Sequence, residues 1–208
     1  MLNIFRFPKV LLLGFFVFQF TSSFAQDKSY RQQLKDFRTD YIQHHEVVIG
    51  DSIKYLRFYP IRKSFEVKAT FTPLVQPEDY KIPTSSGRAK AALKIGYLSF
   101  KLKGKTLKLG VYQLKSLMKT EKYHDYVFTP FTDQNSGIAT YGGGRYLDFT
   151  LDEIQKPYFK IDFNKAYNPS CIYASGFSCP IPPEENDLPI KIKAGEKIYA
   201  LYAKNHQD

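Results

Sequence analysis

The first periodic pattern of apolar residues along the chain has the spacing of an α-helix. Tyr30, Leu34, Phe37 and Tyr41 recur at intervals of four, three and four residues, which places their side chains on one side of a helix. Charged residues fill most of the positions between them. Because this apolar stripe is narrow, we expect an amphipathic helix that packs on the surface of the fold and frays near His45.

Beyond Gly50 the apolar and polar residues alternate, which is the period of a half-buried β-strand. In SFEVKATF, residues 64–71, every second residue from Phe65 onward is apolar. The residues Lys-Gly-Lys at 103–105 predict a hairpin turn, and a change of phase after Tyr97 predicts a β-bulge beside Gly96. The same alternation predicts further strands at residues 126–131, 146–150, 158–163, 188–193 and 197–202.

These elements predict a mainly β fold, either an antiparallel β-sandwich or a partly closed barrel, with one N-terminal amphipathic helix. Strands do not alternate with helices, which argues against a parallel nucleotide-binding sheet. The 18 phenylalanines and 16 tyrosines of the chain suit a thin core between strands, because aromatic side chains favour strands and bury a large area each.

The first 25 residues have the form of an export signal. Arg6 and Lys9 introduce an apolar run at residues 10–18, and Ser23 and Ala25 are small residues at the positions that a signal peptidase reads. The run is shorter than the roughly 20 apolar residues of a spanning helix. We therefore expect residues 26–208 to form a single β-rich domain, exported to the periplasm or the extracellular space, with no membrane span after the signal is removed.

The chain has a formal net charge of +10, and loss of the two basic residues of the signal would leave +8. Its lysines are spread over strand-like segments and do not cluster on one helix, which indicates a solvated basic surface and no nucleic-acid partner. Attraction to an anionic ligand or envelope surface stays open.

The two cysteines, Cys171 and Cys179, predict one disulfide in an oxidising compartment. They do not form a Cys-x-x-Cys motif, so neither thioredoxin-like chemistry nor a zinc knuckle is indicated. The sequence also lacks GxSxG, HExxH and P-loop motifs. We expect no metal and no cofactor.

Three stretches resemble the successive signature blocks of a bacterial and archaeal family known as domain of unknown function 1684. They are FTPFTDQNSGIATYGGGRYLDF, DFNKAYNPSC and CPIPPEENDLPIKIKAGE, and they run in the family's order over Phe128–Glu196. The resemblance implies membership of a family without an established activity. It also implies that the cysteine pair occurs in members without an export signal, so packing or ligand contact stays open for Cys171 and Cys179 beside the disulfide.

The signature blocks contain charged and amide side chains that are candidates for binding a ligand. Strand alternation places Asp162 and Asn164 on one face, where they either bind a polar ligand or cap the turn before Pro169. Arg145 is in phase with core residues, so its guanidinium needs a carboxylate of the protein, such as Asp162 or Glu185, or an anionic ligand. The prolines at 180–183 form a stiff strap over a sheet edge or a barrel mouth. The ligand-binding candidates are Arg145, Asp162, Asn164, Tyr167, Glu185 and Asn186.

These residues leave three functions open. The first is an exported, non-catalytic β-domain that binds a small polar or anionic ligand, or a partner, near the signature blocks. The second is a hydrolase-type enzyme in which Asp162 or Glu185 is the acid or base and Arg145 stabilises charge. The third is a purely structural module. The three functions separate on one observation, namely whether these side chains line one open concavity or form closed networks.

Overall fold

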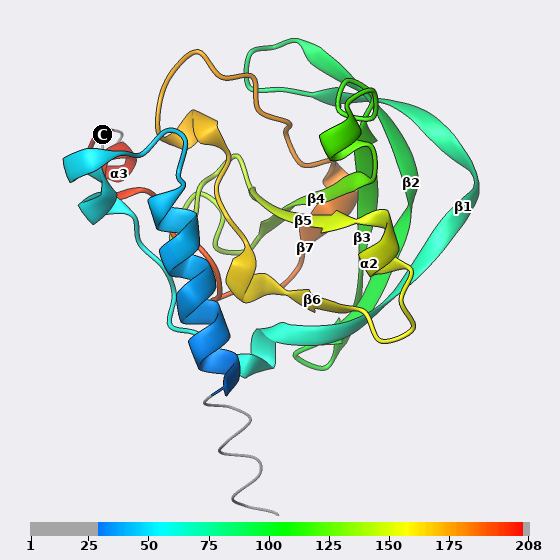
Figure 1. Ribbon diagram of the computed structural model, residues 1–208, viewed down its shortest axis with the longest axis horizontal. Coiled ribbons are helices and arrows are strands. Elements are labelled where there is room, and N and C mark those ends of the chain that lie inside the picture. Colours follow the sequence, from blue (N-terminus) through cyan, green and yellow to red (C-terminus); the bar gives the residue numbers. More distant parts are fainter. Residues whose placement is uncertain (1–28, 206–208) are drawn as a thin grey trace, which may run out of the picture.

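The computed structural model describes residues 29–205, and the expected export signal lies outside them. An N-terminal helix stands beside a strongly curled β-sheet (Figure 1), which confirms the mainly β fold with one N-terminal helix. No helix within residues 29–205 is long and apolar enough to cross a membrane. After the N-terminal helix, residues 29–43, the elements are η1 Gly50–Tyr55, η2 Lys63–Phe65, β1 Glu66–Pro83, β2 Ala89–Leu102, β3 Lys105–Leu114, η3 Glu121–Tyr123, β4 Tyr126–Asp133, β5 Arg145–Thr150, α2 Leu151–Ile154, β6 Lys160–Asp162, η4 Phe163–Lys165, η5 Ser170–Ile172, η6 Glu184–Asn186, β7 Asp187–Leu188 and α3 Ala200–Asn205.

The strands pair in the order β5-β4-β3-β2-β1-β6, and the neighbours along this path are antiparallel. Two-residue β7 adds a short parallel pairing to β4. The sheet curls until its edge strands β5 and β6 approach each other, but they are not paired (Figure 1). The two edges are joined only just beyond β6, where Tyr146 and Tyr167 exchange two backbone hydrogen bonds of 2.9 and 3.2 Å. The fold is therefore a half-barrel with a seam between β5 and β6, the partly closed alternative of the sequence prediction.

The β2–β3 hairpin confirms the predicted turn and bulge. Lys103 and Gly104 both have positive φ, at 51° and 75°, which is the conformation of a two-residue hairpin turn. The pairing register shifts between Lys94 and Gly96, where the alternation of the sequence changes phase.

The inner face of the half-barrel carries the main apolar core. Phe65 and Ala69 are buried in it as the alternation predicts, whereas Val67 and Phe71 are only partly buried against it. Fully buried members from the other strands include Leu98, Leu109, Val111, Val127, Leu147 and Ile161.

Three of the predicted strands differ from the structure. Strand β6 has only three residues because η4 turns the chain directly after Asp162. Residues 189–193 do not pair as a strand, although Ile190 and Ile192 alternate into the core. Residues 197–202 are wrong as a strand, because residues 200–202 begin helix α3 and Tyr199 packs with them in a separate small core. In residues 189–193, alternation reflects burial without strand pairing.

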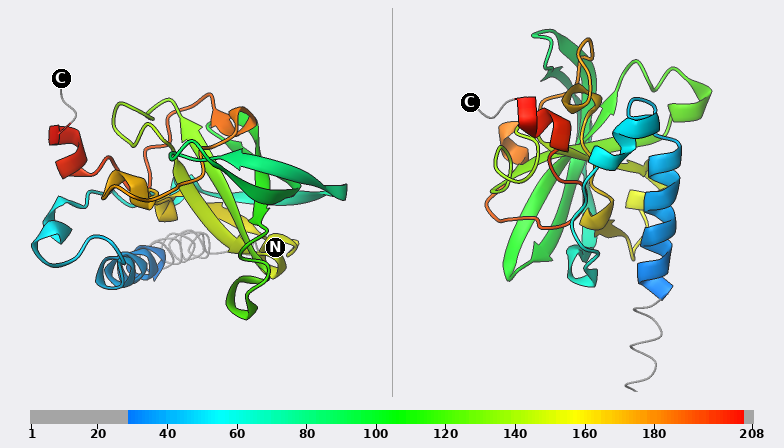
Figure 2. Two further views of the ribbon diagram at one scale, coloured as in Figure 1. Left: turned by 90° about the horizontal axis from the view of Figure 1, so that it is seen from above. Right: turned by 90° about the vertical axis from the view of Figure 1, so that its left-hand side faces the viewer.

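The N-terminal helix lies beside η4 and η5, alongside the seam (Figures 1 and 2). Tyr30 and Leu34 are buried, and the Tyr30 hydroxyl donates to Asp162 Oδ2 at 2.9 Å. Phe37 is 36 % exposed and Tyr41 is half-buried. The first half of the predicted apolar stripe thus packs on the barrel, and the second half faces a pocket.

Candidate functional site

A pocket of about 580 Å³ lies between the N-terminal helix and the seam of the half-barrel. The helix and the turn after it form one wall, while β5, β6 and the segment that follows β6 form the other. We call it the seam pocket. It is lined by Phe37, Asp40, Tyr41, His44, His45, Glu46, Val47, Leu147, Asp148, Phe149, Glu153, Phe159, Lys160, Asp162, Lys165, Tyr167, Asn168, Ser170 and Tyr173.

The lining of the seam pocket is acidic, although the chain as a whole carries a formal charge of +10. Lys160 and Lys165 are its only lysines, and Lys160 already contacts Glu66 at 3.2 Å. The five carboxylates of the lining are Asp40, Glu46, Asp148, Glu153 and Asp162. A cleft lined by one sign of charge attracts ligands of the opposite sign, so this pocket disfavours anions.

Asp148 projects from the face of β5 that carries Tyr146, opposite to the inner core face. Its two carboxylate oxygens accept hydrogen bonds from the hydroxyls of Tyr126 at 2.8 Å and Tyr167 at 2.7 Å. Water reaches the side chain, yet protein surrounds it closely enough that desolvation raises the pKa of its carboxyl group. Within residues 29–205 we find no ion pair for this carboxylate.

Glu196 is a second carboxylate, fully buried behind the pocket wall. It accepts hydrogen bonds from the Tyr173 hydroxyl at 2.6 Å, the Tyr41 hydroxyl at 3.2 Å and the Asn168 backbone N–H at 2.9 Å. Burial raises the pKa of Glu196 to about 7. Gly195 positions this residue: its φ is +73°, and a Cβ there would lie 2.5 Å from the Ala166 carbonyl oxygen.

Two polar atoms of the pocket wall lack a partner within the described part of the chain. His45 accepts the backbone N–H groups of Val47 and Val48 at Nδ1, at 3.2 and 3.0 Å, so the neutral ring carries its proton on Nε2. That Nε2 and Asn168 Oδ1 are both buried without a hydrogen bond. The wall therefore presents one spare donor and one spare acceptor, which native structures rarely leave unused.

Two of the six predicted residues, Asp162 and Tyr167, line the seam pocket. Asp162 also accepts the Tyr30 hydroxyl and the Asn164 backbone N–H at 3.0 Å, so it caps the turn after β6. Asn164 lies beside it but is buried, and its amide bonds both the N–H and the C=O of Arg62, at 3.0 and 2.9 Å. Asn164 therefore fastens the chain before η2 to the end of β6.

Arg145 is on the inner face of β5, as its phase predicts, but its predicted partners Asp162 and Glu185 are wrong. Its guanidinium is 1 % exposed and pairs with Asp133 at 2.6 Å. Tyr146, the next residue, pairs with Tyr167, yet the side chain of Arg145 points to the opposite side of β5. The remaining hydrogen bonds of Arg145 go to the backbone carbonyl oxygens of Ile192, Ala194 and Glu196.

Glu185 and Asn186 belong to separate closed networks. Glu185 pairs with Lys94 at 2.8 Å and accepts the Tyr112 hydroxyl. Asn186 is fully buried, and its amide bonds the N–H and C=O of Gly110 and the C=O of Pro130, at 2.6, 3.1 and 2.7 Å. Strands β3 and β4 share a single paired position. Where the two strands diverge, the Asn186 amide bonds the backbone groups that a neighbouring strand would otherwise bond.

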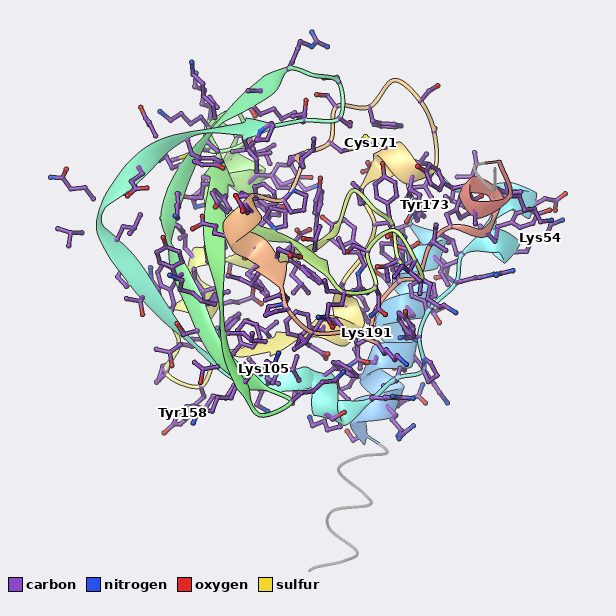
Figure 3. The ribbon with its side chains drawn as sticks, turned by 180° about the vertical axis from the view of Figure 1, so that it is seen from behind. Lys54, Lys105, Tyr158, Cys171, Tyr173 and Lys191 are labelled. Carbon is purple, nitrogen blue, oxygen red and sulfur yellow. A yellow bond between two sulfur atoms is a disulfide. The ribbon has the colours of Figure 1, made fainter. Side chains whose placement is uncertain are left out.

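The predicted disulfide is present between Cys171 and Cys179, with their Cα atoms 6.2 Å apart. It closes the loop after η5, near Tyr173 of the pocket wall (Figure 3). The proline-rich strap that follows is bonded to the end of β1, where the Ile181 N–H donates to the Pro83 carbonyl oxygen at 2.8 Å, which supports its role as an edge cover. Among the described residues, no group of three or more histidine, cysteine, aspartate or glutamate side chains could hold a metal.

The sequence analysis missed Tyr41, His45, Asp148 and Asn168 as residues of the pocket lining, and Glu196 as the carboxylate behind it. Asp148 was within reach of sequence reasoning, because alternation places it on the face of β5 opposite to Arg145. Glu196 ends the third signature block, but nothing in its local sequence indicates that it contacts a helix about 150 residues earlier in the chain.

The profile of a family described as "Protein of unknown function (DUF1684)" matches residues 51–197. The chain belongs to the DUF1684 family. It is similar to the uncharacterised protein from gene locus rrnAC0354 of Haloarcula marismortui, whose solution NMR structure matches with a TM-score of 0.61 and 30% sequence identity. That match covers 83% of this chain and 96% of the archaeal one. The comparison with curated proteins found no similar sequence. Asp148, Tyr167 and Glu196 lie within the matched residues, whereas Tyr41 and His45 precede them.

Proposed function

We propose that this DUF1684 protein binds a small polar ligand, neutral or cationic, in the seam pocket, and that it does so outside the cytoplasm. The observation that carries the proposal is an acidic, aromatic-lined pocket in a basic protein. Its volume of about 580 Å³ is within the range of small-molecule sites. The spare donor of His45 and the spare acceptor of Asn168 support a ligand with hydrogen-bonding groups.

Binding accounts for the geometry better than the hydrolase-type alternative does. That alternative needs Arg145 to stabilise charge beside Asp162 or Glu185. Arg145 is instead buried with Asp133, and Glu185 is held by Lys94 in another network. A purely structural role suits Arg145, Glu185 and Asn186, but it does not explain the buried Asn168 oxygen that has no partner within the described residues beside the pocket.

The test is a ligand screen by ¹H–¹⁵N NMR on residues 26–208. The panel contains choline, ethanolamine, glucose, glycine, citrate and inorganic phosphate, each titrated to millimolar concentration. We expect a neutral or cationic member to shift resonances of residues 41–47, 147–149 and 167–173, and Asp148→Asn to weaken that response. Asp51→Asn is the matched control, because Asp51 is exposed and lies outside the pocket lining.

The proposal is wrong if no member of the panel shifts the pocket resonances. It is equally wrong if only citrate or phosphate does, because an acidic lining disfavours both anions.

A further inference from the structure

Asp148 is an anion without a cationic partner, held in a defined orientation. The hydroxyls of Tyr126 and Tyr167 fix one oxygen each, and both tyrosines stay protonated because burial raises their pKa values. These two hydrogen bonds orient the carboxylate, but they do not neutralise it. Asp148 is exposed, and within residues 29–205 no cation is paired with it, so its charge is available to a cationic ligand.

Aromatic rings line the same pocket. Tyr41 and Tyr167 lie with their ring centroids 6.3 Å apart across the two walls of the pocket, and Phe149 contacts Phe159 at 5.1 Å. The faces of such rings attract cations, and quaternary ammonium groups in particular are recognised by clusters of aromatic rings. The aromatic residues of the lining are Phe37, Tyr41, Phe149, Phe159, Tyr167 and Tyr173.

A second observation points to a ligand independently of the charge. Asn168 is 2 % exposed and lines the pocket, its Nδ2 donates to the Lys197 carbonyl oxygen at 2.8 Å, and its Oδ1 has no partner within the described residues. An amide oxygen accepts hydrogen bonds only. The missing partner is therefore a donor, such as a hydroxyl or an N–H group.

From these contacts we infer that the ligand of the seam pocket carries an organic ammonium group, with Asp148 as its counter-ion and a hydroxyl or N–H group within reach of Asn168. The inference rests on the proposed function and names the chemical class of its ligand, a compact amine or amino alcohol. A sugar would use the same hydrogen-bonding groups, but it has no positive charge to pair with Asp148.

The experiment compares choline with 3,3-dimethylbutan-1-ol, which has the same shape with carbon in place of the charged nitrogen. Dissociation constants are measured by NMR titration or calorimetry at pH 7, and ethanolamine is included as a primary amine. We expect at least one of the two cations to bind at least tenfold more tightly than the neutral alcohol. Asp148→Asn should weaken cation binding at least tenfold and remove the preference over the alcohol.

Two further variants keep the result interpretable. Tyr167→Phe retains the ring and removes one hydroxyl from Asp148, so it should weaken cation binding only about threefold. Asp51→Asn should bind like the wild type. The melting temperature of each variant is measured beside its affinity, so that loss of binding is separated from loss of folding.

The outcomes that overturn the inference differ from those that overturn the proposed function. If the neutral alcohol or glucose binds the pocket as tightly as the cations, or Asp148→Asn leaves the affinities unchanged, the ammonium inference is wrong and ligand binding stands. If none of these compounds, nor any other member of the panel, shifts the pocket resonances, ligand binding itself is wrong.

Discussion

Strand β5 carries two charged residues three positions apart, Arg145 and Asp148, in opposite surroundings. On the inner face, Arg145 is 1 % exposed, and its guanidinium contacts one carboxylate and three carbonyl oxygens. On the other face, Asp148 is reached by water, bonds two hydroxyl groups and forms no ion pair within residues 29–205. One signature block therefore holds both a buried charge that is paired inside the protein and a charge that is open to solvent.

The difference shows that burial of a charge and completeness of its partners must be considered together. A buried charge with all its partners inside the protein, such as Arg145, has no capacity left for a ligand. A charge that water reaches and that has no ion pair within residues 29–205, such as Asp148, can still pair with a cation. Only a charge of the second kind gains favourable electrostatic free energy when a ligand of opposite charge binds.

The largest expected effect concerns Arg145 on the inner face of β5. Arg145→Met leaves Asp133 as a buried, unpaired charge and should lower the free energy of unfolding by about 3–5 kcal/mol, measured by urea denaturation. Arg145→Met combined with Asp133→Leu should recover part of this loss.

Asp162→Leu in the Arg145→Met background is the matched control, because Asp162 does not contact Arg145. Equal rescue by Asp162→Leu would contradict the pairing of Arg145 with Asp133.

The next effect concerns Glu196, which bonds both Arg145 and two tyrosines of the pocket wall. Its carbonyl oxygen accepts from Arg145, and its carboxylate accepts from Tyr41 and Tyr173. Its pKa is about 7 in the fold and lower in the unfolded chain, so the native state binds its proton more tightly. Stability from this group is therefore full at low pH and is lost as the pH rises from about 4.5 through 7, by about 3 kcal/mol.

Glu196→Gln cannot ionise, so the variant should become more stable relative to the wild type as the pH rises. Urea denaturation of both proteins at pH 4.5, 6 and 8 measures this difference directly. A difference that does not change with pH would mean that Glu196 titrates normally.

A smaller effect is expected for the disulfide, which closes the loop behind Tyr173. Replacing both Cys171 and Cys179 by serine removes a cross-link between residues eight positions apart, worth about 2.5 kcal/mol on a chain-entropy estimate. The loss should appear in urea denaturation, and Arg145 should keep its environment. Two titratable thiols per chain in denatured, unreduced protein would show that the bond is absent.

The smallest effect is expected for Asp148→Asn. The amide oxygen accepts one tyrosine hydroxyl and the amide N–H donates to the oxygen of the other, without the desolvation cost of a carboxylate. Stability at pH 7 should therefore change by less than about 1 kcal/mol or rise slightly. Thermal and urea denaturation beside Arg145→Met provide the comparison. A loss of 3 kcal/mol or more would place Asp148 with the structural charges and remove the basis of the ligand-binding proposal.

Much of the fold could be predicted from periodicity, because the strands of the barrel bury one face and expose the other. The N-terminal helix, the turn at Lys103–Gly104 and the bulge beside Gly96 all follow from local pattern. The C-terminal segments could not be predicted in this way. Ile190 and Ile192 alternate because their side chains fill the core. The Ile192 carbonyl oxygen accepts a hydrogen bond from Arg145 and not from a neighbouring strand.

The candidate site was harder to predict, because its residues meet only in three dimensions. The sequence correctly marked Asp162, Asn164 and Arg145 as residues needing partners, but not which partners they have. Asp133 lies 12 residues from Arg145 along the chain, and Tyr30 lies 132 residues from Asp162. Pairings over such distances depend on how the sheet curls, which local periodicity does not report.

The two walls of the seam pocket differ in their relation to the family. The family profile begins at residue 51, after the N-terminal helix that supplies Phe37 and Tyr41 and the turn that supplies His45. The opposite wall, with Asp148 and Asn168, lies inside it. If the pocket binds the proposed ligand, changes of the exposed Phe37 in the helix would alter the aromatic content of the pocket while Asp148 keeps its two tyrosine hydrogen bonds. Tyr30 and Tyr41 would have to stay, because their hydroxyls fasten the helix to Asp162 and Glu196.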